Sequence, residues 1–301
     1  MNKVEFTNHI GVKLAGTVYF PASFDSTKTY AAIITIGPAS GVKEQTSGLY
    51  ARKLAEKGFV TIAFDPSFQG ESGGEPRHQE NPIARVEDVR GAVDFLVSLP
   101  YVDENRIGAL GICAGGGYAV SAAMTERRIN AVGVSVPVDG GRENRAAGPQ
   151  ATVATLEQIA QQRSAEARGA EPMIVPWIPD EYQQSTDIDL REAYQYYRTS
   201  RAHNSNWQNK LRFSTMDAVM PYSAFHLSDT LLTQPLQIVV GSKPGAFNSN
   251  RDGHDLYKQA ASTKKDLMVM EGASHFDLYD NAKYQDPAVD KFSEFFHSNL
   301  K

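Results

Sequence analysis

The sequence contains little cysteine and no long apolar run. Cys113 is the only cysteine among 301 residues, which excludes an internal disulfide and a Cys-rich metal site. No apolar stretch approaches the roughly 20 residues that cross a bilayer, and the first residues lack the apolar core of a signal peptide. The net charge is −5 with no basic cluster, which argues against nucleic acid as a partner. These absences predict a soluble, cytoplasmic protein, and the lack of a histidine pair at ligand spacing argues against a metal enzyme.

Apolar segments alternate with amphipathic ones along most of the chain. An N-terminal hairpin is expected over residues 3–20, and helices are expected over 44–57, 84–99 and from about Pro287 to the end. Short buried strands are expected at residues 31–36, 59–64, 106–110, 131–136, 236–240 and 267–270. This order predicts an α/β fold in which a mostly parallel, twisted sheet is covered by helices on both faces.

The segment from about 140 to 230 interrupts this alternation. It contains two charged helical pieces, at 154–168 and 189–201, and the sequence Pro176-Trp177-Ile178-Pro179 between them. A structureless loop of this length is improbable. The interpretation is a helical cap (140–230) inserted between the two parts of a core (1–139 and 231–301). We expect Trp177 to contribute to an aromatic or apolar binding site under this cap.

Cys113 occupies the most informative position in the sequence. The string Gly111-Ile112-Cys113-Ala114-Gly115 follows a short apolar strand and precedes a helix of small residues. Strand, Gly-x-nucleophile-x-Gly turn and helix together form a nucleophile elbow, in which the flanking glycines avoid a clash in a tight turn. Cys113 is therefore the candidate nucleophile.

A cysteine nucleophile needs a base and an acid that orients the base. His275 follows the last predicted sheet strand, which is where the histidine of such an elbow is expected. The loop after strand 236–240 lacks the usual carboxylate. Asp139, just past strand 131–136, is the preferred acid, followed by Asp255 and Asp252. Each of these three residues could instead cap a helix or a turn.

The expected oxyanion hole combines two backbone N–H groups. One belongs to Ala114, directly after the nucleophile, and the other comes from the loop 37–41 after the first buried strand. Pro38 has no N–H, so Ala39 is the expected second donor. The small Ser40 beside it is expected to lie at the substrate.

The elbow Gly-Ile-Cys-Ala-Gly-Gly-Gly resembles that of the dienelactone hydrolase family. The stretches 41–45, 64–77 and 272–280 are closer to a YcjY-like branch of bacterial α/β hydrolases. This resemblance implies an α/β-hydrolase fold, Cys113 and His275 as nucleophile and base, and hydrolysis without cofactor. It also implies that Glu44 contacts the resting cysteine. The chain departs from the family where Gly37-Pro38 replaces Gly-His-Pro and where the acid after strand 236–240 is missing.

Three functions remain open from the sequence. The first is hydrolysis of a small ester, lactone or thioester by a Cys-His-Asp triad through a covalent acyl-enzyme. The second is acyl transfer or lactone-forming cyclisation on the same elbow. The third is a binding protein that retains the fold without catalysis. A homodimer is compatible with each of them.

Overall fold

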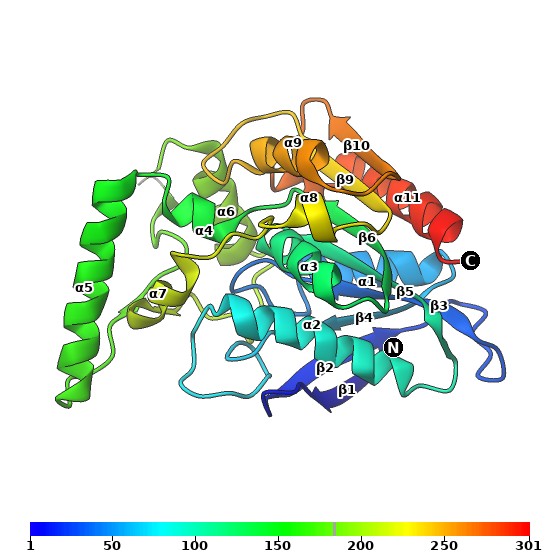
Figure 1. The fold of residues 1–301 in the computed structure, drawn as a ribbon, viewed down its shortest axis with the longest axis horizontal. Coiled ribbons are helices and arrows are strands. Elements are labelled where there is room, and N and C mark those ends of the chain that lie inside the picture. Colours follow the sequence, from blue (N-terminus) through cyan, green and yellow to red (C-terminus); the bar gives the residue numbers. More distant parts are fainter. Residues whose placement is uncertain (183–184) are drawn as a thin grey trace.

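The computed structural model describes residues 1–182 and 185–301. Within these residues the core is an eight-stranded sheet with the order β1-β2-β4-β3-β5-β6-β9-β10 (Figure 1). The strands are β1 (Asn2–Thr7), β2 (Lys13–Tyr19), β3 (Tyr30–Ile36), β4 (Val60–Phe64), β5 (Val102–Ile112), β6 (Ile129–Ser135), β9 (Leu236–Gly241) and β10 (Lys265–Met270).

Strands β1 and β2 form an antiparallel hairpin, and β2 also pairs antiparallel with β4. All other neighbours in the sheet pair in parallel. Strands β4 and β9 are buried along their whole length, as expected for parallel strands that helices cover on both faces. Because these strands run in one direction, the loops after β3, β5, β6, β9 and β10 meet at one edge of the sheet.

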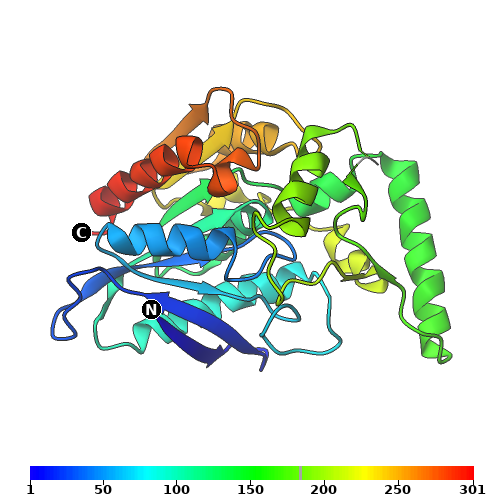
Figure 2. The same cartoon turned by 180° about the vertical axis from the view of Figure 1, so that it is seen from behind.

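Helices cover both faces of the sheet. Helices α2 (Pro82–Val97), α3 (Ala114–Thr125) and α9 (Ser249–Gln259) lie in front of the sheet in Figure 1. Helices α1 (Thr46–Glu56) and α11 (Ala282–Asn299) cover the opposite face, which Figure 2 shows from behind. The predicted fold class is confirmed.

Helix α11 begins before the proline that was expected to open it. It starts at Ala282 and carries Pro287 in its interior. The side chain of Asn281 explains the earlier start, because it accepts a hydrogen bond from the backbone N–H of Lys283 at 3.2 Å and so caps the helix. The capping side chain of Asn281, and not Pro287, therefore determines where helix α11 begins.

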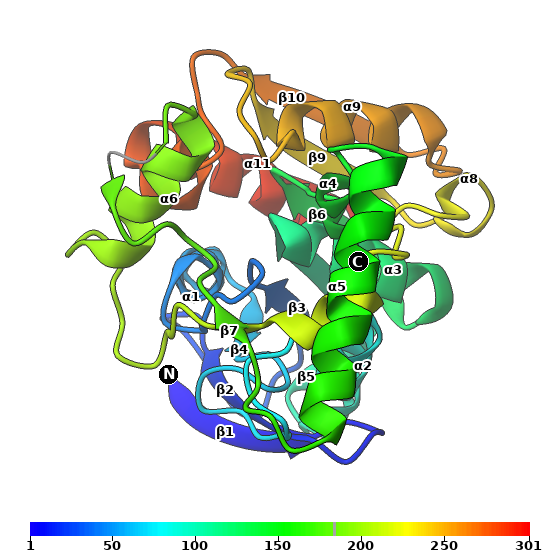
Figure 3. The ribbon, with the colours of Figure 1, turned by 90° about the vertical axis from the view of Figure 1, so that its left-hand side faces the viewer.

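The segment between β6 and β9 leaves the sheet and contains short elements around one long helix. They are α4 (Gly140–Asn144), α5 (Pro149–Ala167), β7 (Ile174–Val175), α6 (Ile188–Arg198), β8 (Leu211–Arg212), η2 (Phe213–Thr215), α7 (Met216–Val219) and α8 (Ser228–Leu231). Strands β7 and β8 pair antiparallel. Figure 3, viewed from the α5 side, shows α5 and α6 on opposite sides of the sheet edge where the loops gather. No helix of the described residues has the length and apolarity to cross a bilayer.

Candidate active site

Cys113 lies between the end of β5 and the start of α3. Its backbone has φ 59° and ψ −129°, a strained conformation for a non-glycine residue. Backbone hydrogen bonds hold it there: its N–H donates to Ser135 at 3.0 Å, and its carbonyl accepts from Gly116 at 2.8 Å and Val138 at 3.1 Å. The strained turn of a nucleophile elbow is thus present at the predicted residue.

The two glycines of the elbow are required by close backbone contacts. A Cβ atom on Gly111 would lie 2.2 Å from the carbonyl oxygen of Gly115. A Cβ atom on Gly115 would lie 2.3 Å from the carbonyl oxygen of Ile36, at the end of β3. The first oxygen belongs to helix α3 and the second to strand β3, so neither can move away without distorting its element, and only glycine fits.

The loop after β3 is fixed by a buried arginine from α2. Nη2 of Arg85 donates to the carbonyl oxygens of Gly37 at 2.6 Å and Pro38 at 3.3 Å, and the Arg85 side chain is only 4% exposed. The N–H of Gly41 also donates to the Pro38 oxygen, at 3.1 Å. Because a trans peptide points its C=O and N–H in opposite directions, the N–H of Ala39 points away from Arg85. Within the described residues it has no acceptor.

Arg85 belongs to a small buried cluster. Its guanidinium lies 4.8 Å from the ring centre of Tyr118, and its Nε is 3.6 Å from Oε1 of Glu80. The Tyr118 hydroxyl donates to the same Oε1 at 2.7 Å. The nearby carboxylate compensates the buried positive charge and leaves Nη2 directed at the loop.

A mostly apolar cavity of about 150 Å³ opens above the elbow. Its lining includes Ala39, Ala114, Ser40 and Trp177, for which the sequence predicted roles at the substrate, together with the nucleophile candidate. The other lining residues are Pro38, Val138, Gly140, Glu143, Asn144, Ile178, Tyr197, Phe247, Phe276 and Tyr279. Trp177 is held in place because its Nε1 donates to the backbone oxygen of Lys210 at 3.0 Å.

His275 lies in the loop between β10 and the short helix α10 (Asp277–Asp280). Gly272 makes the turn after β10 with φ +75°. Ser274 and Asp277 then cap one another: the Ser274 N–H donates to Oδ2 of Asp277 at 3.0 Å, and the Asp277 N–H donates to Oγ of Ser274 at 3.1 Å. These bonds fix the backbone on both sides of His275, which is 2% exposed.

The His275 ring has a hydrogen-bond partner on each nitrogen. Nδ1 lies 2.9 Å from Oγ of Ser249, and Nε2 lies 3.2 Å from the hydroxyl of Tyr279. The Tyr279 hydroxyl also lies beside the Cys113 thiol, and its interaction with the sulfur lowers the pKa of that thiol. Among the described contacts, nucleophile and base are therefore linked through Tyr279.

Burial keeps the thiol and the imidazole uncharged. It raises the pKa of Cys113 to about 11, against the smaller opposing effects of the Tyr279 and Ala114 hydrogen bonds. Burial also lowers the pKa of His275 to about 3. The resting pair is a neutral thiol and a neutral ring, because neither charged form is solvated.

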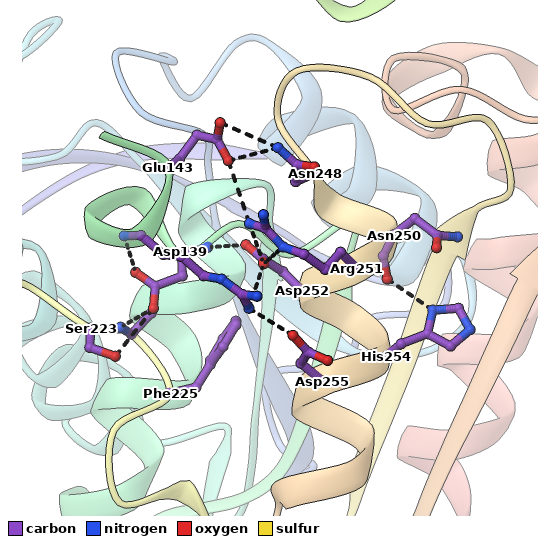
Figure 4. Close-up of polar contacts among 12 residues, drawn as sticks. Asp139, Glu143, Ser223, Phe225, Asn248, Asn250, Arg251, Asp252, His254 and Asp255 are labelled. Atoms are coloured by element: carbon purple, nitrogen blue, oxygen red, sulfur yellow. Dashed lines mark hydrogen bonds and ion pairs between the residues drawn. The ribbon is translucent and has the colours of Figure 1, made fainter. Parts of the chain in front are cut away.

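The structure does not bring Asp139 to His275. Its carboxylate caps α4 by accepting from the N–H of Arg142 at 3.1 Å, and it accepts from Ser223 at 3.3 Å and Ala224 at 3.1 Å (Figure 4). Asp139 therefore caps a helix, which is the alternative role that the sequence left open. Its own N–H donates to Asp252 at 2.9 Å.

Asp252 and Asp255 also lie in a separate polar network. Arg142 reaches Asp252 at 3.3 Å and Asp255 at 2.7 Å, and Arg251 reaches Asp252 at 2.9 Å (Figure 4). The position opposite Nδ1 belongs instead to Ser249, the first residue of α9. Ser249 follows β9, which is where the acid was expected. A serine at that place does not stand out in the sequence, because only a carboxylate was expected there.

Glu44 is placed outside the cavity. It pairs with the buried Nζ of Lys43 at 2.8 Å and accepts from Asn206 at 3.4 Å, and the cavity lining does not include it. Lys43 also binds Asp65 at 2.9 Å, so Glu44 belongs to an ion-pair cluster beside α1. The contact with the cysteine that the resemblance implied is absent.

Three residues of the site escaped the sequence analysis. Tyr279 comes only four residues after His275, and the turn from the loop into α10 brings the two rings together. Arg85 was one charged residue of an amphipathic helix, and Ser249 one of several serines. Only the Tyr279 spacing offered a usable signal.

The geometry agrees with comparisons to known proteins. The sequence model of the family "Serine aminopeptidase, S33" matches residues 29–282. This chain belongs to the S33 family of α/β hydrolases. The α/β-hydrolase fold is confirmed, while the family's name refers to serine and this member carries Cys113 at the elbow. The dienelactone-hydrolase resemblance stays a prediction.

Relatives of this S33-family member cover nearly its whole length. The uncharacterised protein YcjY of Escherichia coli strain K12 is 42% identical over 99% of both chains. The crystal structure of PA2218 from Pseudomonas aeruginosa superposes with a TM-score of 0.89 at 34% identity, covering 99% of this chain and 93% of that one. A thiohydrolase of Eupenicillium brefeldianum is 23% identical over 94% of this chain and 89% of its own.

Proposed function

We propose that this α/β hydrolase cleaves small activated esters or thioesters through an acyl-enzyme on Cys113, with His275 as general base. One observation carries the proposal. Cys113 lines an apolar cavity together with Ala114 and Ala39, the two expected oxyanion donors, and Tyr279 connects it to the neutral ring of His275. These are the parts that acyl transfer needs.

Acylation starts from the neutral pair. Sγ of Cys113 attacks the substrate carbonyl carbon while the thiol proton moves to Nε2 of His275. The carbonyl π electrons move onto oxygen, where the N–H groups of Ala39 and Ala114 stabilise the charge. The bond to the leaving group then breaks, and the leaving sulfur or oxygen takes the proton from His275.

Deacylation repeats these events with water. Water attacks the thioester carbonyl and gives a proton to His275, the C–S bond breaks, and the proton returns to Sγ. The hydrogen bond between Nδ1 of His275 and Ser249 holds the ring in position throughout, and the reacting tautomer carries its proton on Nδ1. The product is a free carboxylic acid.

The cavity restricts the acyl group to a small, uncharged one. A cavity of about 150 Å³ matches one that holds a single benzene ring. No lysine or arginine lines it, and its one carboxylate, Glu143, has a pKa raised by burial. A thiolate attacking a thioester expels a leaving group as good as itself, whereas an alkyl alkoxide leaves poorly and the adduct reverts. Thioesters are therefore preferred, which agrees with the similarity to a fungal thiohydrolase.

Turnover of matched substrates tests the proposal. Benzoyl and acetyl thioesters of N-acetylcysteamine should be hydrolysed by the wild type at least tenfold faster than the corresponding ethyl esters, and by Cys113→Ala not at all. Equal turnover by Cys113→Ala, or no thioester turnover by the wild type, would refute the function.

A further inference from the structure

The base of the proposed reaction does not reach the cavity. His275 is absent from the described cavity lining, whereas Tyr279 is part of it. The ring of Tyr279 lies beside that of His275, with ring centres 5.2 Å apart. None of the described hydrogen bonds joins Cys113 directly to His275, and the Tyr279 hydroxyl contacts both side chains.

The hydroxyl interacts with the Cys113 thiol, the His275 ring and the hydroxyl of Tyr197. It lies 3.2 Å from Nε2 of His275. In the tautomer that carries the ring proton on Nδ1, His275 donates to Ser249, and the Tyr279 O–H donates to Nε2. The phenol oxygen is then free to accept the S–H of Cys113. The directions of these bonds form one continuous chain from sulfur to imidazole.

We propose that Tyr279 is a catalytic residue that relays the proton between Cys113 and His275. This inference rests on the proposed function. As Sγ bonds to the substrate carbon, its proton moves to the Tyr279 oxygen while the Tyr279 proton moves to Nε2 of His275. The phenol is neutral before and after the step, and both protons return by the same route when the leaving group departs.

Packing keeps the Tyr279 hydroxyl in this position. The ring is 1% exposed and lies against Tyr196 with ring centres 5.0 Å apart and against Phe276 at 4.5 Å. Burial holds the pKa of the hydroxyl well above its usual range, so a separate phenolate does not form. A fixed, neutral phenol suits a concerted transfer, because it gives one proton as it receives another.

Removal of the hydroxyl tests the relay. In Tyr279→Phe the pre-steady-state release of p-nitrophenol from p-nitrophenyl acetate should fall about 100-fold, the usual contribution of general acid–base catalysis. Tyr196→Phe is the matched control, because it removes a hydroxyl from the neighbouring buried ring, which does not line the cavity. We expect it to remain within twofold of the wild type.

The outcomes distinguish a failure of the proposed Tyr279 relay from a failure of the proposed hydrolase function. If Tyr279→Phe keeps the wild-type rate while Cys113→Ala and His275→Ala lose it, the relay is refuted and the hydrolase stands. If the wild type releases p-nitrophenol no faster than Cys113→Ala, both are refuted.

A second measurement uses only the wild type and so does not depend on the folding of a variant. The acylation rate in mixtures of H₂O and D₂O should fall along a downward-bowed curve, since two protons move in one step. A straight line would show a single moving proton and would overturn the relay.

Discussion

Nδ1 of His275 lies 2.9 Å from the hydroxyl of Ser249, a neutral partner where a catalytic carboxylate was expected. The hydroxyl orients the ring through this hydrogen bond. It cannot stabilise the imidazolium as a negative charge would. Cys113 and His275 are therefore uncharged before the reaction, and charge develops on them only in the transition state.

Substitutions at Ser249 should distinguish the effect of orienting the His275 ring from the effect of placing a negative charge at its Nδ1. In Ser249→Ala the ring loses its partner, and acylation should fall about tenfold, the equivalent of one hydrogen bond. Ser249→Asp places a carboxylate at Nδ1, which favours the protonated ring and should raise the pKa of His275. The pH profile of acylation measures this: its acid limb should move to higher pH in Ser249→Asp. An unchanged profile would contradict this arrangement.

The reactivity of the lone cysteine should depend steeply on pH. Burial raises the pKa of Cys113 to about 11, so at pH 7 roughly one thiol in 10⁴ is a thiolate. Alkylation by iodoacetamide, followed by intact mass, should therefore speed up about tenfold for each pH unit between 7 and 10. A flat rate from pH 5 to 8 would instead reveal a thiolate–imidazolium pair.

Arg85 does not line the cavity, but we expect it to support catalysis by fixing the loop that carries the Ala39 N–H. Without its bonds to the carbonyls of Gly37 and Pro38, the Ala39 N–H loses its fixed direction, and losing one oxyanion donor costs about 100-fold or more in kcat. The variant Arg85→Met carries Glu80→Gln as well, so that no buried carboxylate is left without its partner.

The control for this prediction lies on the same helix. Arg90→Met removes a half-exposed arginine that pairs with Glu87, and it should leave kcat within twofold. The double variant should lose kcat with KM little changed. Wild-type kcat in a folded double variant would show that the loop holds its conformation without Arg85.

Elbow glycines offer a stability test. Gly115→Ala forces a methyl group to within 2.3 Å of the Ile36 carbonyl, which should destabilise the fold by about 3 kcal/mol or more. A Cβ on Gly140 meets nothing within 4 Å, so Gly140→Ala should unfold at the wild-type urea midpoint. Equal midpoints for the two variants would show that α3 can shift away from β3.

The sequence predicted those parts of the site that backbone geometry dictates. A strand, a Gly-x-Cys-x-Gly turn and a helix place Cys113 and Ala114, and small residues after the first parallel strand place Ala39 and Ser40. In each case the spacing along the chain fixes the position in space.

The remaining parts depend on side chains that meet across the fold. Asp139 looked like a triad acid because it follows a strand, yet a residue there can equally cap a helix, and it caps α4. Ser249 and Arg85 are common residue types whose partners lie 26 and 48 positions away. No local pattern distinguishes them from surface residues, and the start of α9 at Ser249 was itself missed.

The most direct test of the account is intact mass spectrometry after mixing with p-nitrophenyl acetate at pH 7. Cys113 is the only thiol of the chain. The account predicts that the wild type gains one acetyl group, that the adduct disappears on incubation in buffer, and that Cys113→Ala gains none. An acetyl group on Cys113→Ala, or none on the wild type, would contradict covalent hydrolysis at this elbow.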